Sequence, residues 1–174
     1  MNERAAKEYS EVLHIYEYHP WHGGINPEWN YNSGLILDVK KEGERGINHF
    51  TMKLQPMLSF DVEYVICVIP PHQKDAKTSG IKTIARRLCH PPVIDGTGII
   101  ARIRDMPKKT DSGVRDINME IESLQVMDKA LIEGKQVLLM DDVTTSGKSL
   151  EAGKRILEES GASLVVKLAL GITR

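Results

Sequence analysis

The chain has 174 residues, of which 41% are hydrophobic and 27% charged, and its formal net charge is −1 at pH 7. A chain of this length can bury an ordinary core as one compact unit. Its near-zero net charge gives no general attraction for nucleic acid or for a membrane surface. No apolar run approaches the roughly twenty residues of a membrane span, and residues 1–10 are too polar for a signal peptide. We therefore expect a cytoplasmic protein.

The first sixty residues differ in pattern from the rest of the chain. Residues 19–31 are rich in aromatic, Gly, Asn and Pro residues and are typical of a loop. Residues 12–18 and 34–39 are predicted to be strands on either side of this loop, and apolar residues between 47 and 58 indicate a following helix. We expect residues 1–60 to form an N-terminal unit and residues 61–174 to form the core.

Strand and helix patterns alternate from about residue 62 onward. The expected strands are residues 63–69, a stretch around 99–101, and residues 123–127, 136–142 and 163–170, and the expected helices begin near residues 78 and 147. Strands alternating with helices of this length favour right-handed parallel crossovers. The predicted fold class is α/β, an open, mostly parallel sheet flanked by helices. Ligands bind such sheets beyond the carboxyl ends of the strands.

The most informative stretch is residues 137–149, Val-Leu-Leu-Met-Asp-Asp-Val-Thr-Thr-Ser-Gly-Lys-Ser. Its apolar half predicts a strand buried on both faces, and a helix begins near Gly147. The first N–H groups of a helix lack partners within it and lie at the positive end of its dipole, so they can bind phosphate beside the Thr and Ser hydroxyls. Asp141 and Asp142 can accept hydrogen bonds from sugar hydroxyls.

Two other interpretations of this stretch are open. Gly147-Lys148-Ser149 reproduces the end of a Walker A loop, but the earlier glycine of that motif would fall at position 142, which is Asp142. A nucleoside triphosphate site is therefore disfavoured. A buried strand followed by a capped helix, with two acids by chance, remains an alternative. Adjacent carboxylates at a strand end favour a functional site, because ionised groups in a confined place need partners.

The 137–149 stretch resembles the phosphoribosyl pyrophosphate signature of type I phosphoribosyltransferases. The resemblance implies the type I phosphoribosyltransferase fold, with a small N-terminal subdomain, the hood, over the base end of the site. In that family the two acids contact the ribose hydroxyls and the next loop wraps the 5′-phosphate. Asp141 and Asp142 would thus position the ribose. The implied phosphate-binding residues are Val143, Thr144, Thr145, Ser146, Gly147, Lys148 and Ser149.

Two further loops fit the same resemblance. Residues 70–80 are placed like the family's pyrophosphate loop, which presents backbone N–H groups to diphosphate oxygens. The implied diphosphate-binding residues are Pro70, Pro71, His72 and Lys74, and His72 or Lys74 could add positive charge. A cis peptide at Ile69-Pro70 or Pro70-Pro71 would suit such a loop. Residues 102–118 resemble the loop that closes over the reacting centre. Arg102 and Arg104 are the expected stabilisers of the charge that develops, with Arg115 as a third candidate. For His72, the alternative is an exposed loop histidine without a role in binding. For residues 102–118, the alternative is an ordinary solvated loop.

Other segments resemble the ComF-like subgroup of phosphoribosyltransferases. These are residues 39–43, 69–72, 101–104 and 115–118. The zinc-binding segment at the start of ComF is absent, and Cys67 and Cys89 are too few for a four-cysteine zinc site. We expect both cysteines to be reduced thiols.

The implied function is a phosphoribosyltransferase, a pentosyl-transferring glycosyltransferase of nucleotide metabolism. It would bind phosphoribosyl pyrophosphate with Mg²⁺ and transfer ribose 5-phosphate to a nitrogenous base, releasing pyrophosphate. We expect Mg²⁺ to arrive with substrate and water, near Asp141 and Asp142, rather than in a protein cage. The alternative is a non-catalytic regulatory or competence-related protein that binds the same donor. A homodimer is common among relatives.

The acceptor base is less determined than the donor. Hypoxanthine-guanine enzymes have an aspartate where this chain has Thr145. Adenine and orotate enzymes usually have glycine where this chain has Lys148. We therefore expect an unusual nucleobase-like acceptor.

Overall fold

The computed structural model describes residues 12–59, 61–73, 78–106 and 116–173. Its main sheet contains β1 (Leu13–Glu17), β2 (Val65–Val68), β3 (Ile94–Asp95), β6 (Gln136–Thr144) and β7 (Leu164–Ile172). The strand order is β1-β7-β6-β2-β3, and every neighbouring pair is parallel. A separate antiparallel pair consists of β4 (Ile100–Arg102) and β5 (Leu124–Val126). The expected α/β class with a mostly parallel sheet is confirmed.

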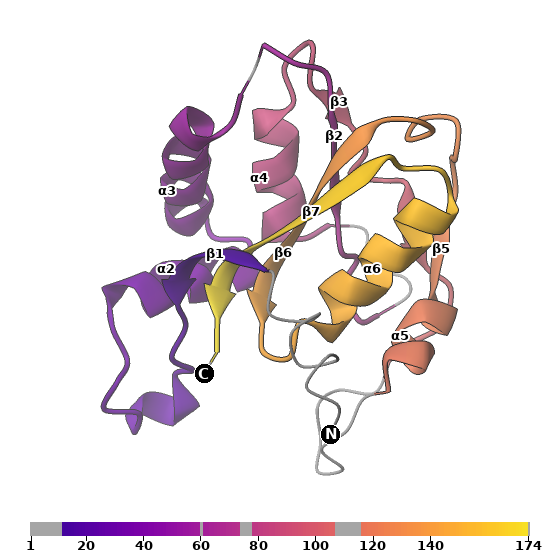
Figure 1. Ribbon diagram of the computed structural model, residues 1–174. Coiled ribbons are helices and arrows are strands. Elements are labelled where there is room, and N and C mark those ends of the chain that lie inside the picture. Colours follow the sequence, from indigo (N-terminus) through magenta and orange to yellow (C-terminus); the bar gives the residue numbers. More distant parts are fainter. Residues whose placement is uncertain (1–11, 60, 74–77, 107–115, 174) are drawn as a thin grey trace.

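Helices cover both faces of the sheet (Figure 1). One face is covered by α2 (Tyr31–Lys40), α3 (Glu44–Leu54) and α4 (Gly80–Leu88), and the other by α5 (Ile117–Ser123), α6 (Lys148–Glu159) and the β4–β5 pair. Short 3₁₀ turns occupy His22–Gly24 and Gln55–Met57. Successive strand residues alternate between the faces, so Ile66 and Val68 pack with α4, whereas Val65 and Cys67 join the core beneath α6.

The predicted strand at residues 34–39 is wrong, because these residues belong to α2. The Asn30 side chain accepts a hydrogen bond from the Ser33 N–H and caps the helix start. Leu35, Ile36 and Val39 are buried at helical spacing against the sheet. A short apolar run of this kind fits either a buried strand or a buried helix, and the cap decides between them.

Most other predicted elements are confirmed. β1 lies within residues 12–18, and α3 covers most of the predicted helix after residue 47. The strand carrying the two acids runs two residues further than expected, to Thr144. The two-residue strand β3 was not predicted.

The N-terminal elements share the core of the remaining chain. β1 extends the sheet by pairing with β7, and α3 packs against α4. The division at residue 60 stays a prediction. Within the described ranges, no helix is both long and apolar enough to cross a membrane.

Both cysteines are free thiols, as expected from the sequence. Burial raises the pKa of both Cys67 and Cys89 to about 12. Both side chains are therefore protonated and unreactive at neutral pH.

Candidate active site

The sheet has a switch point between β2 and β6. The chain leaves β2 through α4 and reaches β3 on one side, and it leaves β6 through α6 and reaches β7 on the other. These two helices lie on opposite faces of the sheet. A crevice suitable for a ligand forms at the carboxyl ends of two such strands. Pro70 and Pro71 follow β2 at this point, and Asp141 and Asp142 lie near the end of β6.

β6 continues beyond the end of its neighbour β2. The last pair between these strands joins Val68 to Met140, and Asp141, Val143 and Thr144 pair with β7 alone. The two acids therefore lie on the part of β6 that β2 does not cover.

The two acids make hydrogen bonds to the backbone that follows them. Asp141 Oδ1 accepts from the Asp142 N–H at 2.8 Å, and Asp142 Oδ1 accepts from the Val143 N–H at 2.6 Å. Desolvation raises the pKa of Asp141, and the neighbouring Asp142 charge raises it further. The hydrogen bond from the Asp142 N–H and the Lys40 charge oppose this shift. Asp141 consequently holds a proton to higher pH than an ordinary aspartate.

Lys40 is a candidate site residue that was not predicted from the sequence. It is the last residue of α2, and its Nζ lies 3.2 Å from Asp142 Oδ1. The same Nζ lies 5.9 Å from the centre of the Tyr18 ring. Lys40 thus links the ribose-binding candidates to the loop that follows β1. The resemblance at residues 39–43 included this lysine without indicating its partner.

The predicted phosphate loop is held by an internal hydrogen bond. Thr144 is buried, and its Oγ1 accepts from the Gly147 N–H at 3.0 Å. Gly147 has φ of +73°, a left-handed conformation that glycine adopts without steric cost. The next residue, Lys148, begins α6, and no side chain caps this helix start. Thr145 and Ser146 are exposed, whereas Val143, Lys148 and Ser149 are half-buried. The loop therefore presents hydroxyls beside an uncapped helix N-terminus.

Arg102 lies beneath the loop after β2. Its side chain is only 1% exposed, and Nε donates to the Pro71 carbonyl at 2.7 Å. Nη2 donates to the Pro70 carbonyl at 3.3 Å. In this arrangement the guanidinium holds the loop from inside the protein. Its predicted direct contact with diphosphate stays a prediction.

Glu120 joins Arg102 to the phosphate loop, and sequence reasoning missed it. Its fully buried carboxylate places Oε2 3.4 Å from Arg102 Nη1 and accepts from Ser149 Oγ through Oε1 at 3.3 Å. One buried carboxylate thus contacts residues associated with both predicted anion-binding loops. Only its place on α5, among alternating polar residues, marks Glu120 in the sequence, and that pattern predicts an exposed residue.

The other predicted residues lie around this centre. Arg104 is half-exposed and donates to the Glu122 carbonyl and carboxylate. His72 is exposed, and its carbonyl accepts from the Met106 N–H at 3.1 Å. Lys74 and Arg115, and most of the predicted closing loop, lie outside the described residues. The expected cis peptide before Pro70 or Pro71 is wrong, because the cis peptide of the described chain joins Pro91 and Pro92.

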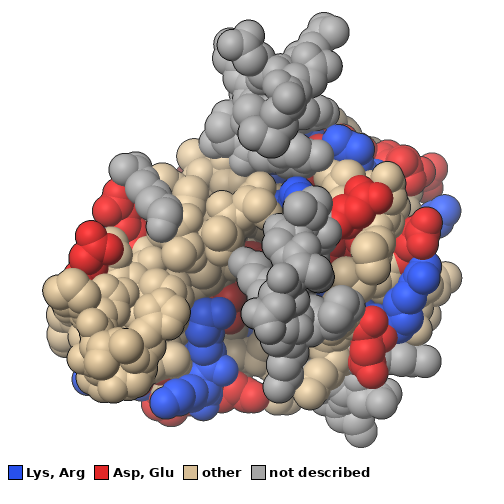
Figure 2. Space-filling view, turned by 90° about the horizontal axis from the view of Figure 1, so that it is seen from below, with Lys and Arg blue, Asp and Glu red and all other residues tan. Residues whose placement is uncertain are grey.

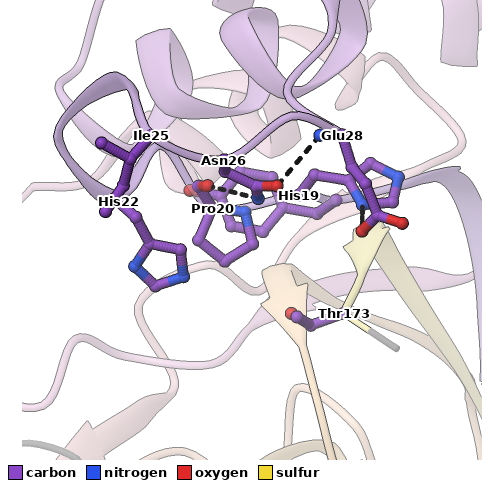
Figure 3. Close-up of a pocket in the computed structure, with 8 residues that line it drawn as sticks. His19, Pro20, His22, Ile25, Asn26, Glu28 and Thr173 are labelled. Atoms are coloured by element: carbon purple, nitrogen blue, oxygen red, sulfur yellow. Dashed lines mark hydrogen bonds and ion pairs between the residues drawn. The ribbon is translucent and has the colours of Figure 1, made fainter.

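A cavity of about 450 Å³ opens between the loop after β1 and Thr173, which follows β7 (Figure 3). Its lining residues are Tyr18, His19, Pro20, His22, Ile25, Asn26, Glu28 and Thr173. All except Thr173 come from the loop after β1, which the Asn26 side chain folds back by donating to the Pro20 carbonyl at 2.8 Å. Thr173 follows β7, and its Oγ1 lies 3.3 Å from that of Thr145. The cavity therefore adjoins the phosphate loop directly.

Charged groups of both signs surround this end of the molecule. Figure 2 shows the face at the carboxyl ends of the strands, where Lys and Arg side chains occur beside Asp and Glu side chains. Neither sign forms a continuous patch over the described residues visible on this face. Recognition at this face must therefore depend on local groups.

Comparison with known proteins identifies the domain. A model of the phosphoribosyl transferase domain family matches residues 81–174, more than half of the chain. An adenine phosphoribosyltransferase from Treponema denticola is 34% identical over 67 residues, which are 38% of this chain and 35% of that protein. The chain therefore matches about a third of the length of this relative.

Solved structures also show a distant likeness. A hypoxanthine phosphoribosyltransferase from Staphylococcus aureus matches with 14% identity and a TM-score of 0.39, covering 75% of this chain and 60% of that chain. The enzyme from Trypanosoma cruzi matches with 15% identity and a TM-score of 0.40, covering 82% and 67%. With the family match extending over β3 to β7, the chain belongs to the phosphoribosyl transferase domain family.

Proposed function

We propose that this protein is a phosphoribosyltransferase that uses phosphoribosyl pyrophosphate as donor. It transfers ribose 5-phosphate to a nitrogenous base and releases pyrophosphate. The observation that carries the proposal is the meeting of two loops at the switch point. Asp141, Asp142 and the phosphate loop follow β6, and Pro70 and Pro71 follow the neighbouring β2.

The donor would lie across both loops. Asp141 and Asp142 accept hydrogen bonds from the ribose hydroxyls, and residues 143–149 surround the 5′-phosphate at the uncapped start of α6. The diphosphate lies near the loop that begins with Pro70 and Pro71. Lys40 balances part of the negative charge that two carboxylates bring close to an anionic ligand. These groups hold the reacting carbon in place, and such orientation can supply much of the rate enhancement.

The two aspartates also fit a magnesium ion that arrives with its substrate. Carboxylate oxygens are ligands that Mg²⁺ prefers. The described ranges contain no cluster of three or more His, Cys, Asp or Glu side chains suited to hold a metal. Asp141 and Asp142 would be the residues that hold the ion when it arrives with the substrate. When bound, Mg²⁺ supplies Lewis-acid stabilisation of the charge on the departing diphosphate.

The cavity after β1 is the proposed acceptor end. Its volume of about 450 Å³ lies in the range of small-molecule sites. His19, Asn26 and Glu28 carry polar groups around it (Figure 3). Contact between Thr173 and Thr145 places it beside the phosphate loop, and Lys40 connects its Tyr18 wall to Asp142. A nucleobase-like acceptor in this cavity would face the ribose from the side opposite the diphosphate.

A first experiment separates donor binding from turnover. Thermal unfolding is measured with Mg²⁺ and phosphoribosyl pyrophosphate, and pyrophosphate release is then followed with a panel of purine, pyrimidine and pyridine bases. A ligand at one hundred times its Kd stabilises a protein by about 2.7 kcal/mol. A stabilised protein that releases pyrophosphate with one base supports the proposal. Stabilisation without release for any base would indicate a binding module that senses the donor.

A double substitution tests the ribose assignment. Asp141→Asn with Asp142→Asn should abolish the stabilisation by phosphoribosyl pyrophosphate. The matched control is Asp61→Asn with Asp128→Asn, which makes the same charge change at two exposed positions outside the site. If the site variant is stabilised as much as the control, the assignment of the ribose to this acid pair is wrong.

A further inference from the structure

The Glu120 carboxylate is fully buried and has no role in the chemistry proposed above. Glu120 lies on α5, and this helix packs against α6, which follows the phosphate loop. An ionised group is costly to bury unless charged and hydrogen-bonded partners surround it. Glu120 has such partners on two sides, Arg102 at Oε2 and Ser149 at Oε1.

Arg102 carries the connection toward the loop after β2. Ser123 helps to fix the guanidinium, because its Oγ accepts from Arg102 Nη1 at 2.6 Å and donates to the Glu120 carbonyl at 2.7 Å. Nε and Nη2 are then directed at the carbonyls of Pro71 and Pro70. The planar guanidinium can hold two acceptors at once in a fixed geometry, which a lysine cannot do.

Holding the Pro71 carbonyl also orients the next peptide N–H. The bond between Pro71 and His72 is trans. In a trans peptide the C=O and N–H groups point in opposite directions. Because the carbonyl points at buried Arg102, the His72 N–H points away from it. Arg102 therefore fixes the orientation of the peptide between Pro71 and His72.

Ser149 carries the connection toward the other loop. It is the second residue of α6, immediately after Gly147 and Lys148, and its Oγ donates to Glu120 Oε1 at 3.3 Å. A displacement of the Glu120 carboxylate would therefore disturb its contacts with both the first turn of α6 and Arg102.

We propose that Glu120 is a positioning residue that, through Arg102 and Ser149, fixes the distance between two loops, the one that begins with Pro70 and Pro71 and the phosphate loop. The inference rests on the proposed function, because it takes the donor to span both loops. The effect on binding should then depend on whether a ligand touches one loop or both. Pyrophosphate alone needs only the first loop, and ribose 5-phosphate alone needs only the second. Phosphoribosyl pyrophosphate needs both at the correct spacing.

The test compares these three ligands by titration calorimetry, with Mg²⁺ present, in the unaltered chain and in Glu120→Gln. Glutamine keeps the shape of the side chain and loses its charge. We expect the variant to bind each fragment within about threefold of the original affinity. Its affinity for phosphoribosyl pyrophosphate should fall by about tenfold or more, which is the loss typical of residues that support ligand-contacting groups.

A second variant covers the case in which Glu120→Gln does not fold. Arg102→Lys keeps the positive charge beside Glu120 but cannot hold both proline carbonyls. It should give the same selective loss for the full donor. If Arg102 instead contacted diphosphate directly, this variant would weaken pyrophosphate and the full donor equally.

A buried-pair control separates positioning from stability. Glu151→Gln breaks the ion pair with Lys167, in which both side chains are 3% exposed. It should lower stability while leaving the affinity ratio between the full donor and its fragments unchanged. The inference is overturned if Glu120→Gln binds the full donor with its original affinity. It is also overturned if the affinities for the fragments fall by the same factor as the affinity for the full donor. If the unaltered chain binds none of the three ligands, the proposed function fails, and the inference fails with it.

Discussion

Lys40 Nζ lies 3.2 Å from Asp142 Oδ1, although the two residues are 102 positions apart in the chain. The contact joins the end of α2 to the end of β6, so it brings a cation from the N-terminal region to the predicted ribose acids. Lys40 also lowers the pKa of the neighbouring Asp141, partly offsetting desolvation and the charge of Asp142. The first sixty residues therefore contribute a charged group to the proposed donor site.

Lys40→Met should weaken binding of ribose 5-phosphate. The two aspartates would then face an anionic ligand without their neighbouring cation. Because both side chains are partly exposed, the pair contributes about 1 kcal/mol at most, which corresponds to about fivefold in affinity. Titration calorimetry measures the change. The matched control is Lys53→Met, since Lys53 lies over the Tyr16 ring and contacts no site residue that we have named. Equal affinity in the two variants would exclude a role for Lys40.

Asp141→Asn should stabilise the free protein at neutral and alkaline pH. Desolvation and then the Asp142 charge raise the pKa of Asp141 in the folded state. The stability contributed by the protonated group is complete below the ordinary aspartate pKa of about 3.9 and is lost as pH rises through the raised value. Asparagine does not ionise, so the variant avoids this loss. Each kcal/mol corresponds to about 2–4 °C in Tm for a chain of this size.

The difference in Tm between Asp141→Asn and the unaltered chain should therefore grow with pH and vanish near pH 4. Thermal unfolding monitored by circular dichroism at several pH values measures it. Asp128→Asn, which makes the same charge change at an exposed position, is the matched control. A constant difference across the pH range would mean that Asp141 is not titrating as described. Gain of stability at the expense of ligand binding is the expected behaviour of a functional carboxylate.

Glu151→Gln should destabilise the fold by about 3–5 kcal/mol, because it leaves Lys167 buried without its charged partner. Desolvation alone would raise the pKa of Glu151, but hydrogen bonds from Lys167 and Arg155 outweigh it and lower the pKa. The stability from ionised Glu151 is therefore present above the ordinary glutamate pKa and is lost as pH falls through the lowered value. Urea unfolding at neutral and acidic pH should show the cost of the substitution shrinking in acid. If the substitution costs the same stability at neutral and acidic pH, the ion pair between Glu151 and Lys167 does not contribute as described.

Gly147→Ala should weaken phosphate binding as well as stability. Alanine at the left-handed φ of +73° is strained by about 1–2 kcal/mol, and relief of that strain would displace the N–H that donates to Thr144. Gly134→Ala is a matched control, since Gly134 has φ of +70° in the turn before β6, at the other end of that strand. Both variants should lose similar stability, and only Gly147→Ala should lose affinity for ribose 5-phosphate. Equal affinities would show that the loop tolerates the displacement.

The parts of the fold predicted correctly are those with a strong local pattern. The apolar run before Asp141 and the prolines after Ile69 mark two strands and their ends without any knowledge of neighbours. The prediction for residues 34–39 was wrong because periodicity cannot distinguish a strand from a helix in so short an apolar run. The Asn30 cap was the available signal, and the preceding loop composition obscured it.

The candidate site was predicted from the sequence only where its residues are consecutive. Residues 141–149 form one stretch and could be proposed together. Lys40 and Glu120 join the candidate site across 102 and 29 positions, through packing that no local pattern encodes. Arg102 was predicted to be a charged residue near the reacting centre, but its burial beneath Pro70 and Pro71 depends on how β4 packs, which the sequence does not reveal.

The cavity beside Thr173 is bordered almost entirely by one continuous segment, residues 18–28. The donor residues lie in a different segment, so changes in one need not alter the sequence of the other. On the proposed assignment, relatives could evolve different acceptor preferences by varying this single loop while keeping the same donor chemistry. Grafting residues 18–28 from one relative onto another would then be the smallest exchange able to transfer acceptor choice between them.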